Sequence, residues 1–386
     1  MVKQRLEYAI KHYSLLQWVY RNGMSFIIKT IGLFIKTDSD LVLYNSMIGR
    51  ANYDSPKAIF DYLKNNPKYS HLKHVWAFND PESVNYEGCQ KIRMDSINYF
   101  ITALRAKYWV TNVNIERGLH FKKLNTRYLN TWHGLSFNHI GNDVPGRKDY
   151  DSRNTNFICY ESEYHKKILI HALRANESSM IATGLPRNDE LYKVTPEEVL
   201  SLKKELGLPL DKKIIMYAPT WRESTNNGKE YELAPPINFS QWKKELGDEY
   251  CIVLRTHHLT TKLLKVKFDD FVRDFTHYPR INDLFKVSDI LISDYSACMA
   301  DFSILERPVI CFAYDYDSYS SSRGLYIDFE KEFPGGICRT ENEVLNRIKT
   351  MDYAKEKICT GKRIKEKFTN IGGCATQKCV EYLFAE

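Results

Sequence analysis

The chain has 386 residues, enough for two domains of ordinary size, and 43% of them are hydrophobic, enough for a core in each. Charged residues make up 27% and aromatic residues 13%, which excludes an intrinsically disordered protein. The formal net charge is +7, and residues 1–36 contribute +5 of it, with six basic residues against Glu7. The rest of the chain is nearly neutral, which argues against a nucleic-acid-binding protein, whose basic residues would line a groove or a face.

Residues 1–36 form a basic amphipathic segment ahead of this body. Charged residues interrupt its apolar residues and no cleavage site follows, so it does not resemble a secretory signal. It also lacks the run of about 20 apolar residues that a membrane span needs. Two interpretations stay open: a helix lying in a membrane interface, or an amphipathic helix packed on the domain body. Gly23 and Gly32 interrupt the helical pattern.

Short apolar runs alternate with helical patterns through the rest of the chain. Several runs are apolar throughout, which is typical of parallel strands covered by helices on both faces. The alternation predicts an α/β protein with doubly wound sheets. The predicted strands are 41–44, 74–77, 108–111, 128–131, 156–159, 213–217, 251–254, 290–292 and 309–312. The predicted helices are 55–65, 96–105, 162–173, 196–206, 239–246, 281–286, 298–305 and 341–351.

The alternating pattern appears twice along the chain. The first series ends near residues 183–189, a polar helix-forming stretch follows, and a new strand begins at Ile214. We therefore place a domain boundary between about residues 185 and 212. Two Rossmann-like domains with a cleft between them, residues 37–190 and 191–386, have the architecture of the GT-B transferases.

Four polar motifs follow predicted strands, at the edge where open α/β sheets bind ligands. The first, residues 128–134, places His133 at the carboxyl end of a strand, where an imidazole can take a proton from an attacking hydroxyl. The alternative is a histidine hydrogen-bonded within a domain interface. In the second, a buried strand leads into Ala-Pro-Thr-Trp and then Arg222, whose guanidinium can pair with phosphate. Its alternative is an ion pair with Glu223 or another neighbour.

The third motif has Arg255 and His257 two residues apart on one strand, so that both side chains point the same way. An arginine and a histidine at a strand end suit the stabilisation of phosphate charge. Zinc is the rival ligand, but no third metal-binding residue lies at a suitable spacing.

The fourth motif is Ser-Asp-Tyr-Ser at residues 293–296, followed by Asp301. Here a strand leads into a helix whose first N–H groups, together with Ser296, can bind an anion. The alternative is helix capping by Ser296 or Asp294.

Motifs of other enzyme classes are missing from the sequence. It contains no G-x-G-x-x-G, no G-x-x-x-x-G-K-[ST] and no G-x-S-x-G, which argues against a dinucleotide oxidoreductase, a P-loop NTPase and an α/β-hydrolase. Two Asp-Tyr-Asp triplets, 149–151 and 315–317, are similar to the metal-binding acids of other nucleotide-sugar transferases. We interpret them as loop acids, because such short matches are frequent by chance.

Taken in this order, the four motifs resemble those of the CDP-glycerol glycerophosphotransferase family, whose members build teichoic acids and related phosphate-linked capsule polymers. The resemblance covers about residues 40–380. Further matching stretches are residues 49–50, 54–63, 75–78, 183–189 and 323–328.

The resemblance implies a GT-B fold with a cytosolic active site, in a protein peripheral to the inner face of the cell membrane. Residues 37–190 would bind the acceptor, and residues 191–386 the CDP donor. A hydroxyl of a lipid-linked teichoic-acid or capsule polymer would attack the β-phosphate of CDP-glycerol, or of another CDP-alditol, and CMP would leave. No cofactor is firmly implied, a divalent metal ion could assist, and nucleic acid is not an expected partner.

The resemblance also assigns roles to individual residues. His133 would be the general base or acceptor-orienting histidine, and His257 the second essential histidine, in contact with the transferred phosphate. Phosphoryl transfer needs in-line positioning and charge neutralisation, which two imidazoles and several arginines supply. The residues that resemble donor-binding groups are Arg222, Arg255, Asp294, Ser296 and Arg323, with Asp301 in the same motif as Asp294.

The sequence departs from the family pattern in two places. After Trp-His-Gly the family continues with Thr-Pro-Leu-Lys, whereas residues 135–138 are Leu-Ser-Phe-Asn and lack both the hydroxyl at the first position and the ammonium group. Gly134, Asn138 and His139 are then expected on the acceptor side, with His139 restoring part of the charge. Ala297 replaces a second small hydroxyl residue.

These departures leave alternatives open. One is a GT-B glycosyltransferase that uses a nucleotide sugar, and another is an inactive donor-binding scaffold in an envelope-polymer complex. The lipid-borne acceptor that the resemblance implies favours membrane docking of residues 1–36 over packing on the domain body.

Overall fold

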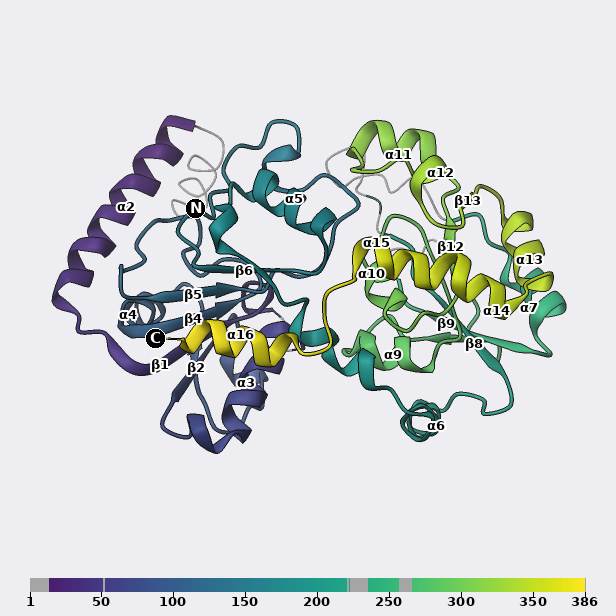
Figure 1. Cartoon of the computed structure of the whole chain (residues 1–386), viewed down its shortest axis with the longest axis horizontal. Coiled ribbons are helices and arrows are strands. Elements are labelled where there is room, and N and C mark those ends of the chain that lie inside the picture. The colour runs from purple at the N-terminus through teal and green to yellow at the C-terminus, as the bar shows by residue number, and fades with distance from the viewer. Residues whose placement is uncertain (1–13, 51–52, 221, 223–234, 257–265, 386) are drawn as a thin grey trace.

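The computed structural model describes residues 14–50, 53–220, 222, 235–256 and 266–385, which form two α/β units (Figure 1). The N-terminal unit contains a seven-stranded parallel sheet in the order β3-β2-β1-β4-β5-β6-β7. The strand order reverses between the paired strands β1 and β4, as in doubly wound folds. Its strands are β1 (Asp38–Asn45), β2 (Lys73–Phe78), β3 (Gln90–Arg93), β4 (Ala106–Thr111), β5 (Arg127–Asn130), β6 (Phe157–Tyr160) and β7 (Met180–Ala182).

The C-terminal unit contains a six-stranded parallel sheet in the order β10-β9-β8-β11-β12-β13. Its order reverses between β8 and β11, so both sheets have a switch point at which ligands bind in folds of this kind. Its strands are β8 (Lys213–Tyr217), β9 (Tyr250–Leu254), β10 (Val272–Asp274), β11 (Ile290–Ser293), β12 (Val309–Phe312) and β13 (Ile337–Cys338).

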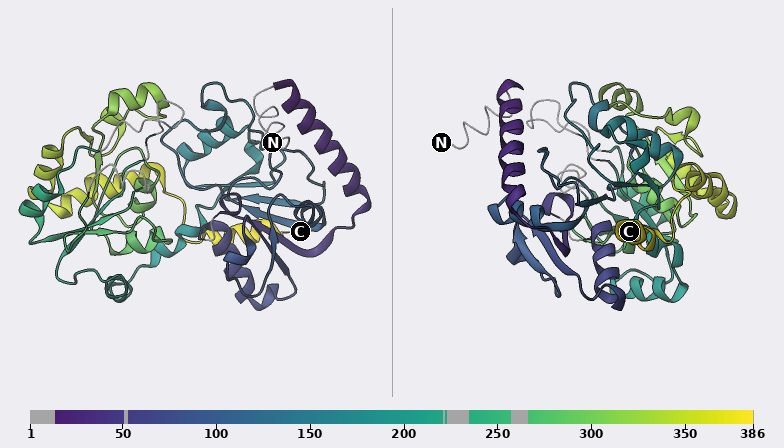
Figure 2. Two further views of the ribbon diagram at one scale, coloured as in Figure 1. Left: turned by 180° about the vertical axis from the view of Figure 1, so that it is seen from behind. Right: turned by 60° about the vertical axis from the view of Figure 1, so that its left-hand side comes forward.

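Helices cover the sheets, and the inner strands are therefore buried; every residue of β9, β11 and β12 is buried. The views in Figure 2 show this layering from behind and from the side. The helices of the N-terminal part are α2 (Ser14–Phe34), α3 (Ser55–Asn65), α4 (Ile97–Arg105) and α5 (Glu163–Leu173), and the 3-10 helix η6 (Pro186–Lys193) leads to the second unit. The remaining helices are α6 (Pro196–Glu205), α7 (Phe239–Leu246), α9 (Ile281–Val287), α10 (Cys298–Ser303), α11 (Tyr316–Arg323), α12 (Phe329–Glu332), α13 (Glu341–Lys349), α14 (Tyr353–Glu356), α15 (Arg363–Phe368) and α16 (Ala375–Phe384).

The last helix, α16, belongs to the N-terminal unit, although residues 191–386 were predicted to form the second domain. It packs against α3, and its buried residues Cys379, Val380 and Leu383 join the core on that face of the N-terminal sheet (Figure 1). The side chain of Asp189 fixes the start of the helix by accepting hydrogen bonds from the backbone N–H groups of Ala375 and Thr376, both at 2.7 Å. The chain thus crosses between the units twice, once through η6 and once before α16.

Helix α2 runs along the outer edge of the N-terminal unit (Figures 1 and 2). It is continuous over 21 residues, so Gly23 and Gly32 do not break it as the sequence suggested. Gly32 instead allows close packing on α4, because an added Cβ would lie 2.9 Å from a methyl carbon of Leu104. Ile28 is buried at this contact.

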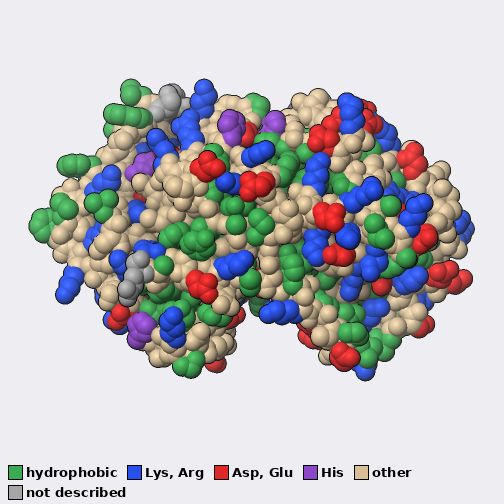
Figure 3. Space-filling model, viewed as in Figure 1, with side chains coloured by type: hydrophobic (Ala, Val, Ile, Leu, Met, Phe, Trp, Pro, Cys, Tyr) green, Lys and Arg blue, Asp and Glu red, His purple; other side chains and the backbone are tan. Residues whose placement is uncertain are grey.

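Most of the apolar surface of α2 is exposed. Figure 3 shows hydrophobic side chains standing out along this edge of the molecule. Within the part of the chain that the structure describes, no helix is both long and apolar enough to span a membrane. The exposed large apolar residues of α2 are Leu15, Leu16, Trp18, Val19, Tyr20, Phe26, Ile27, Ile31, Leu33 and Phe34.

Candidate active site

His133 follows β5, and its surroundings fix which ring nitrogen carries hydrogen. The Nδ1 atom lies 2.9 Å from the backbone oxygen of Asn112, and a carbonyl oxygen can only accept a hydrogen bond. Nδ1 must therefore donate, which leaves Nε2 of the neutral ring with a lone pair. Burial lowers the pKa of His133, and this effect exceeds the opposing effects of the Asn112 hydrogen bond and the Asp54 carboxylate. The ring thus stays neutral and can act as a base near pH 7.

The backbone around His133 is held in an unusual conformation. Trp132 has a φ of +54°, a left-handed conformation that costs a residue with a side chain on the order of 1 kcal/mol or more. Its ring lies against that of His133, with the centroids 4.1 Å apart and the planes tilted by 32°. Gly134 has a φ of +120°, and an added Cβ would lie 2.8 Å from an Arg187 nitrogen and 3.8 Å from the Cβ of Ala297. The glycine therefore lets the His133 turn approach the Ser-Asp-Tyr-Ser turn of the other unit.

Arg187, in η6, joins the two turns, and our sequence analysis did not predict a role for it. Its Nη1 atom donates to Asp54 at 3.0 Å and to the backbone oxygen of His133 at 2.9 Å, while Nη2 donates to Asp301 at 2.8 Å. The guanidinium is only 15% exposed. Burial opposes its charge, but the carboxylates of Asp301 and Asp54 raise the pKa of Arg187 above its ordinary value. Asp301 is thus an ion-pair partner between units, and Asn188 also donates to it at 2.6 Å.

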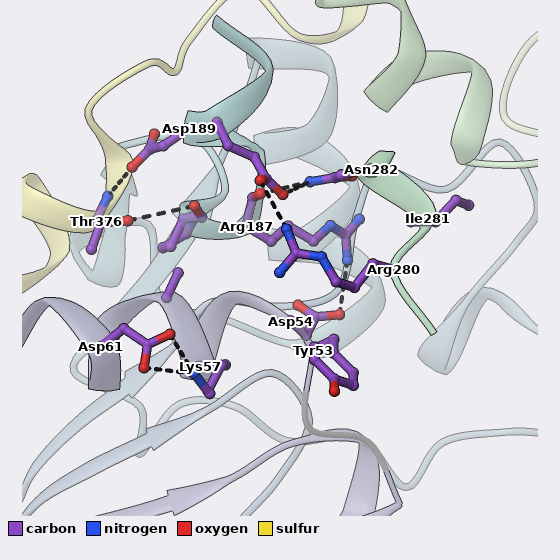
Figure 4. Close-up of a pocket in the computed structure, with 13 residues that line it drawn as sticks. Tyr53, Asp54, Lys57, Asp61, Arg187, Asp189, Arg280, Ile281, Asn282 and Thr376 are labelled. Atoms are coloured by element: carbon purple, nitrogen blue, oxygen red, sulfur yellow. Dashed lines mark hydrogen bonds and ion pairs between the residues drawn. The ribbon is translucent and has the colours of Figure 1, made fainter. Parts of the chain in front are cut away.

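A cavity of about 290 Å³ lies beside Arg187, between the starts of α3 and α9 (Figure 4). The charged groups around it pair with carboxylates: Lys57 with Asp61, and Arg280 with Asp283. Of the predicted site residues that the structure describes, none lines this cavity. Arg187 connects the cavity with the His133 turn.

Arg222 follows β8, and the structure pairs this predicted phosphate ligand with carboxylates, so its role toward a donor stays a prediction. Two of its nitrogens donate to Asp315 at 2.7 and 2.8 Å, and a third donates to the backbone oxygen of Thr220 at 2.8 Å. Asp294 lies 2.9 Å from the same guanidinium. The ion-pair alternative is therefore what the structure contains, with Asp315 of the second Asp-Tyr-Asp triplet as the partner.

Aromatic rings complete the enclosure of Arg222. The guanidinium lies 5.1 Å from the ring centroid of Tyr295 and 4.6 Å from that of Tyr319, within the range of cation–π attraction. These two rings stack with their centroids 4.0 Å apart. Asp294 also accepts a hydrogen bond from the backbone N–H of Thr220 at 2.8 Å. Arg222 and Asp294 thus tie together the turns after β8 and β11.

Arg255 follows β9 and has a different environment. Its guanidinium donates to the backbone oxygens of Phe275, at 3.1 Å, and Tyr278. Among the described residues no carboxylate pairs with it, and burial lowers the pKa of Arg255. A half-buried guanidinium that only carbonyl oxygens neutralise is suited to an anionic ligand. Of the predicted donor ligands placed by the structure, Arg255 best fits that role.

Ser296 lies directly before Ala297, the N-cap residue of the short helix α10, which has no side-chain capping bond. The Ser296 hydroxyl accepts a hydrogen bond from the backbone N–H of Cys298 at 3.3 Å. The side chain is only partly buried, so this bond leaves the hydroxyl hydrogen for another partner. Its role toward a donor stays a prediction.

Residues 135–138, which depart from the family pattern, and His139 extend from the N-terminal unit and contact the C-terminal unit. Phe137 is fully buried among Phe329 and Phe368. Asn138 and Leu325 form an antiparallel bridge, and the backbone N–H of His139 donates to the oxygen of Gly324 at 3.0 Å. The substituted segment therefore holds the units together.

The remaining predicted residues fall on either side of this contact. His139 packs beside Tyr326, with the ring centroids 4.7 Å apart. Arg323 ends α11, directly before Gly324. His257 lies outside the described residues, so its role stays a prediction. Within the described ranges, no three His, Cys, Asp or Glu residues are grouped as metal ligands would be.

Behind the His133 turn, Glu161 is fully enclosed. It accepts a hydrogen bond from the backbone N–H of Leu135 at 3.0 Å, and one of its oxygens lies 3.5 Å from Nδ1 of His165. Burial, together with the nearby Asp301 charge, raises the pKa of Glu161, and burial lowers the pKa of His165. Both groups are therefore uncharged near neutral pH.

Comparison with known proteins places this site in a family. A family model described as CDP-glycerol:poly(glycerophosphate) glycerophosphotransferase matches residues 27–385. A teichoic acid glycerol-phosphate transferase of Staphylococcus aureus is 31% identical, over 90% of this chain and 93% of that protein. A teichoic acid poly(glycerol phosphate) polymerase of Bacillus subtilis is 34% identical over 82% of this chain, which spans 44% of that longer protein.

A solved structure of the wall teichoic acid polymerase TagF is also similar. It superposes with a TM-score of 0.81 and 28% identity, over 99% of this chain and 97% of that one. This similarity confirms the predicted GT-B class. The chain therefore belongs to the CDP-glycerol glycerophosphotransferase family.

Proposed function

We propose that this protein transfers glycerol phosphate from CDP-glycerol to a hydroxyl group of a teichoic acid acceptor and releases CMP. The observation that carries the proposal is the hydrogen bond from His133 Nδ1 to the Asn112 carbonyl, which leaves Nε2 as a neutral base at the contact between the units. A TagF variant that superposes with a TM-score of 0.78 was solved after a soak with CDPG. Relatives named for ribitol phosphate are only 25–27% identical, which supports glycerol as the alditol.

In this proposal Nε2 of His133 takes the proton of the acceptor hydroxyl. The acceptor oxygen forms a bond to the β-phosphorus of CDP-glycerol, and the bond from that phosphorus to the oxygen bridging to the α-phosphate breaks. CMP leaves with the bridging oxygen, and the acceptor gains one glycerol phosphate. Arg255 would stabilise the negative charge that develops on the transferred group. The contribution of His257 and any divalent cation stay predictions.

Arg222 has a supporting role in this account. Direct contact with the donor would require it to leave Asp294 or Asp315, and separating a buried ion pair costs several kcal/mol. We therefore assign Arg222 to holding the turns after β8 and β11, and leave phosphate binding to Arg255, Ser296 and Arg323.

We also propose that α2 docks the protein on the inner face of the cell membrane, where it meets a lipid-linked acceptor. Leu33 and Phe34 are 82% and 86% exposed, and Lys29 and Lys36 lie near them in the sequence. Apolar side chains flanked by basic groups bind anionic bilayers. Leu33→Glu with Phe34→Glu should abolish cosedimentation with anionic vesicles, whereas Leu210→Glu in the other unit should not. Unchanged cosedimentation of the double variant would contradict docking through α2.

A donor comparison tests the proposed reaction. CMP release should occur with CDP-glycerol and a glycerol-phosphate acceptor, more slowly with CDP-ribitol, and nucleotide release should be absent with UDP-sugars. Turnover of a UDP-sugar alone would instead establish a glycosyltransferase. Calorimetric binding of CDP-glycerol without turnover on any acceptor would establish a donor-binding scaffold.

A further inference from the structure

A polar groove runs along the flank of α2 toward the Trp132–His133 turn. It consists of two adjoining cavities, of about 220 and 590 Å³, which share His120 and Asp151. The inner cavity ends at Trp132, whose ring lies against that of His133. The outer cavity begins at Phe26 and Lys29 of α2. We call these two cavities the α2 groove; it connects the helix that carries the exposed apolar surface with the turn that carries the candidate base.

The α2 groove contains cationic groups that an anionic ligand could use. Arg21 makes a long contact of 3.4 Å to Asp149, its one ion pair among the described residues, and its side chain is 31% exposed. Lys29, at the outer end, has no ion-pair partner among the residues that the structure describes. Gly118 has a φ of +79°, and an added Cβ would lie 3.3 Å from Nη2 of Arg21. A glycine at that position thus lets the wall of the groove approach the guanidinium closely.

The rest of the lining can hydrogen-bond to hydroxyl groups. Asp149 and Asp151 supply carboxylate oxygens, and Asn114 and Ser152 supply amide and hydroxyl groups. Asp151 is held by a bidentate pair with Arg153, with distances of 2.9 and 2.6 Å. Cations that bind phosphodiesters next to acceptors that bind hydroxyls match a polyol phosphate chain, which alternates these two groups.

The α2 groove and the proposed donor-binding residues lie in different units of the protein. All its lining residues belong to the N-terminal unit, whereas Arg255 and Ser296 belong to the C-terminal sheet. The inner cavity reaches Trp132, and Gly134, two residues further on, approaches Ala297 of the C-terminal unit. A chain end that passes Trp132 arrives next to the His133 ring.

We propose that the α2 groove binds the polyol phosphate portion of the acceptor, with Arg21 and Lys29 on its phosphodiesters, and delivers its terminal hydroxyl to His133. This inference rests on the proposed glycerol-phosphate transfer. It assigns acceptor contacts to residues that precede and flank the Trp-His-Gly motif, in addition to the predicted Gly134, Asn138 and His139.

The test uses a short soluble oligo(glycerol phosphate), so that membrane docking plays no part. Arg21→Gln with Lys29→Gln should raise the KM for this acceptor about tenfold, because the variant loses two charge-assisted contacts with phosphodiesters. The KM for CDP-glycerol should change less than twofold. Arg105→Gln, a basic residue of α4 outside the groove, is the matched control and should leave both KM values unchanged.

A second variant tests the groove without changing charge. Ser152→Trp places a bulky ring in the inner cavity and should weaken acceptor binding at least as much. An unchanged acceptor KM in both variants, with an active wild-type protein, would overturn the groove proposal and leave the proposed function intact.

Calorimetry separates the two proposals when no turnover is seen. Binding of the oligo(glycerol phosphate) to the wild-type protein, weakened in Arg21→Gln with Lys29→Gln, would support the groove even if CDP-glycerol is not the donor. Equal binding by the wild-type protein and this double variant, or no binding to the wild-type protein, would overturn it.

Discussion

The turns after β5, in the N-terminal sheet, and β8, in the C-terminal sheet, carry a histidine and an arginine, yet the two side chains are used differently. Nδ1 of His133 donates a hydrogen bond to a backbone carbonyl oxygen, and Nε2 retains its lone pair. Arg222 gives its nitrogens to Asp315, Asp294 and the Thr220 carbonyl. A polar residue at a strand end is therefore available to a ligand only where its neighbours leave one of its hydrogen-bonding atoms unpaired. This difference distinguishes a reactive residue from one that supports the fold.

Arg222→Ala should have the largest effect on stability. It leaves Asp294 and Asp315 buried and unpaired, so we expect the free energy of unfolding in urea to fall by about 3 kcal/mol or more. Arg255→Ala is the matched control, because Arg255 donates to backbone oxygens and pairs with no carboxylate among the described residues. It should lose much less stability but most of the activity. Equal stability losses in the two variants would remove the distinction between these arginines.

Arg187→Lys should affect catalysis more than donor binding. A lysine cannot bind Asp54, the His133 carbonyl and Asp301 together, so the His133 turn should lose its fixed position. We expect kcat to fall about tenfold to a hundredfold, with less than a twofold change in the KM for CDP-glycerol. Arg280→Lys lines the same cavity without touching His133 and serves as the control. A rise in KM with unchanged kcat would show that Arg187 acts on the donor instead.

The pH dependence of kcat should reflect the lowered pKa of His133. Below its pKa the ring is protonated at Nε2 and cannot accept the acceptor proton, so activity is lost as the pH falls. Because burial lowers this pKa below the ordinary histidine value of 6.5, the midpoint of the decline in kcat should lie below pH 6.5. A decline that is already half complete above pH 6.5 would contradict the buried, neutral ring.

Glu161→Gln should have the smallest effect, on the pH dependence of stability. Glu161 is protonated in the fold, whereas in the unfolded chain it ionises above its ordinary pKa of about 4.5. Its contribution to stability is therefore greatest below pH 4.5 and declines as the pH rises toward 8. Between pH 5 and pH 8, the free energy of unfolding of the variant should fall less than that of the wild-type protein, by on the order of 1 kcal/mol. Urea unfolding at the two pH values measures this difference. Glu163→Gln, two residues along and exposed, should behave like the wild-type protein.

The long inner strands and helices could be predicted from the sequence because their apolar runs and periodicity are local. The bounds of β8, β12, α3 and α7 match the predicted ranges. The short strands β3, β7, β10 and β13 were missed. Val272–Asp274, for example, offers one buried position and no apolar run. Nothing local in α16 indicates that it crosses back to the first sheet, because its apolar stripe would fit either core.

The residues of the candidate site also fall into two groups, those that the local sequence predicts and those that it does not. The sequence places His133, Arg255 and Ser296 at strand ends, and the structure agrees. The sequence could not show that Asp315 pairs with the Arg222 guanidinium, because the two residues are 93 positions apart and only the folded structure brings them together. Arg187 was missed because it lies in a connecting helix and follows no strand, although the Thr183–Asp189 stretch around it matched the family. The replacement of residues 135–138 left the substrates and the activity open in the sequence, and the structure shows that Phe137 is a packing residue between the units.

CMP release from CDP-glycerol by the wild-type protein and by His133→Ala is the most direct test of the central claim. The account predicts steady CMP release with a glycerol-phosphate acceptor for the wild-type protein. It predicts a decrease of about a hundredfold or more for His133→Ala, with unchanged urea unfolding. Near-normal turnover of a folded His133→Ala variant would contradict the assignment of His133 as the base.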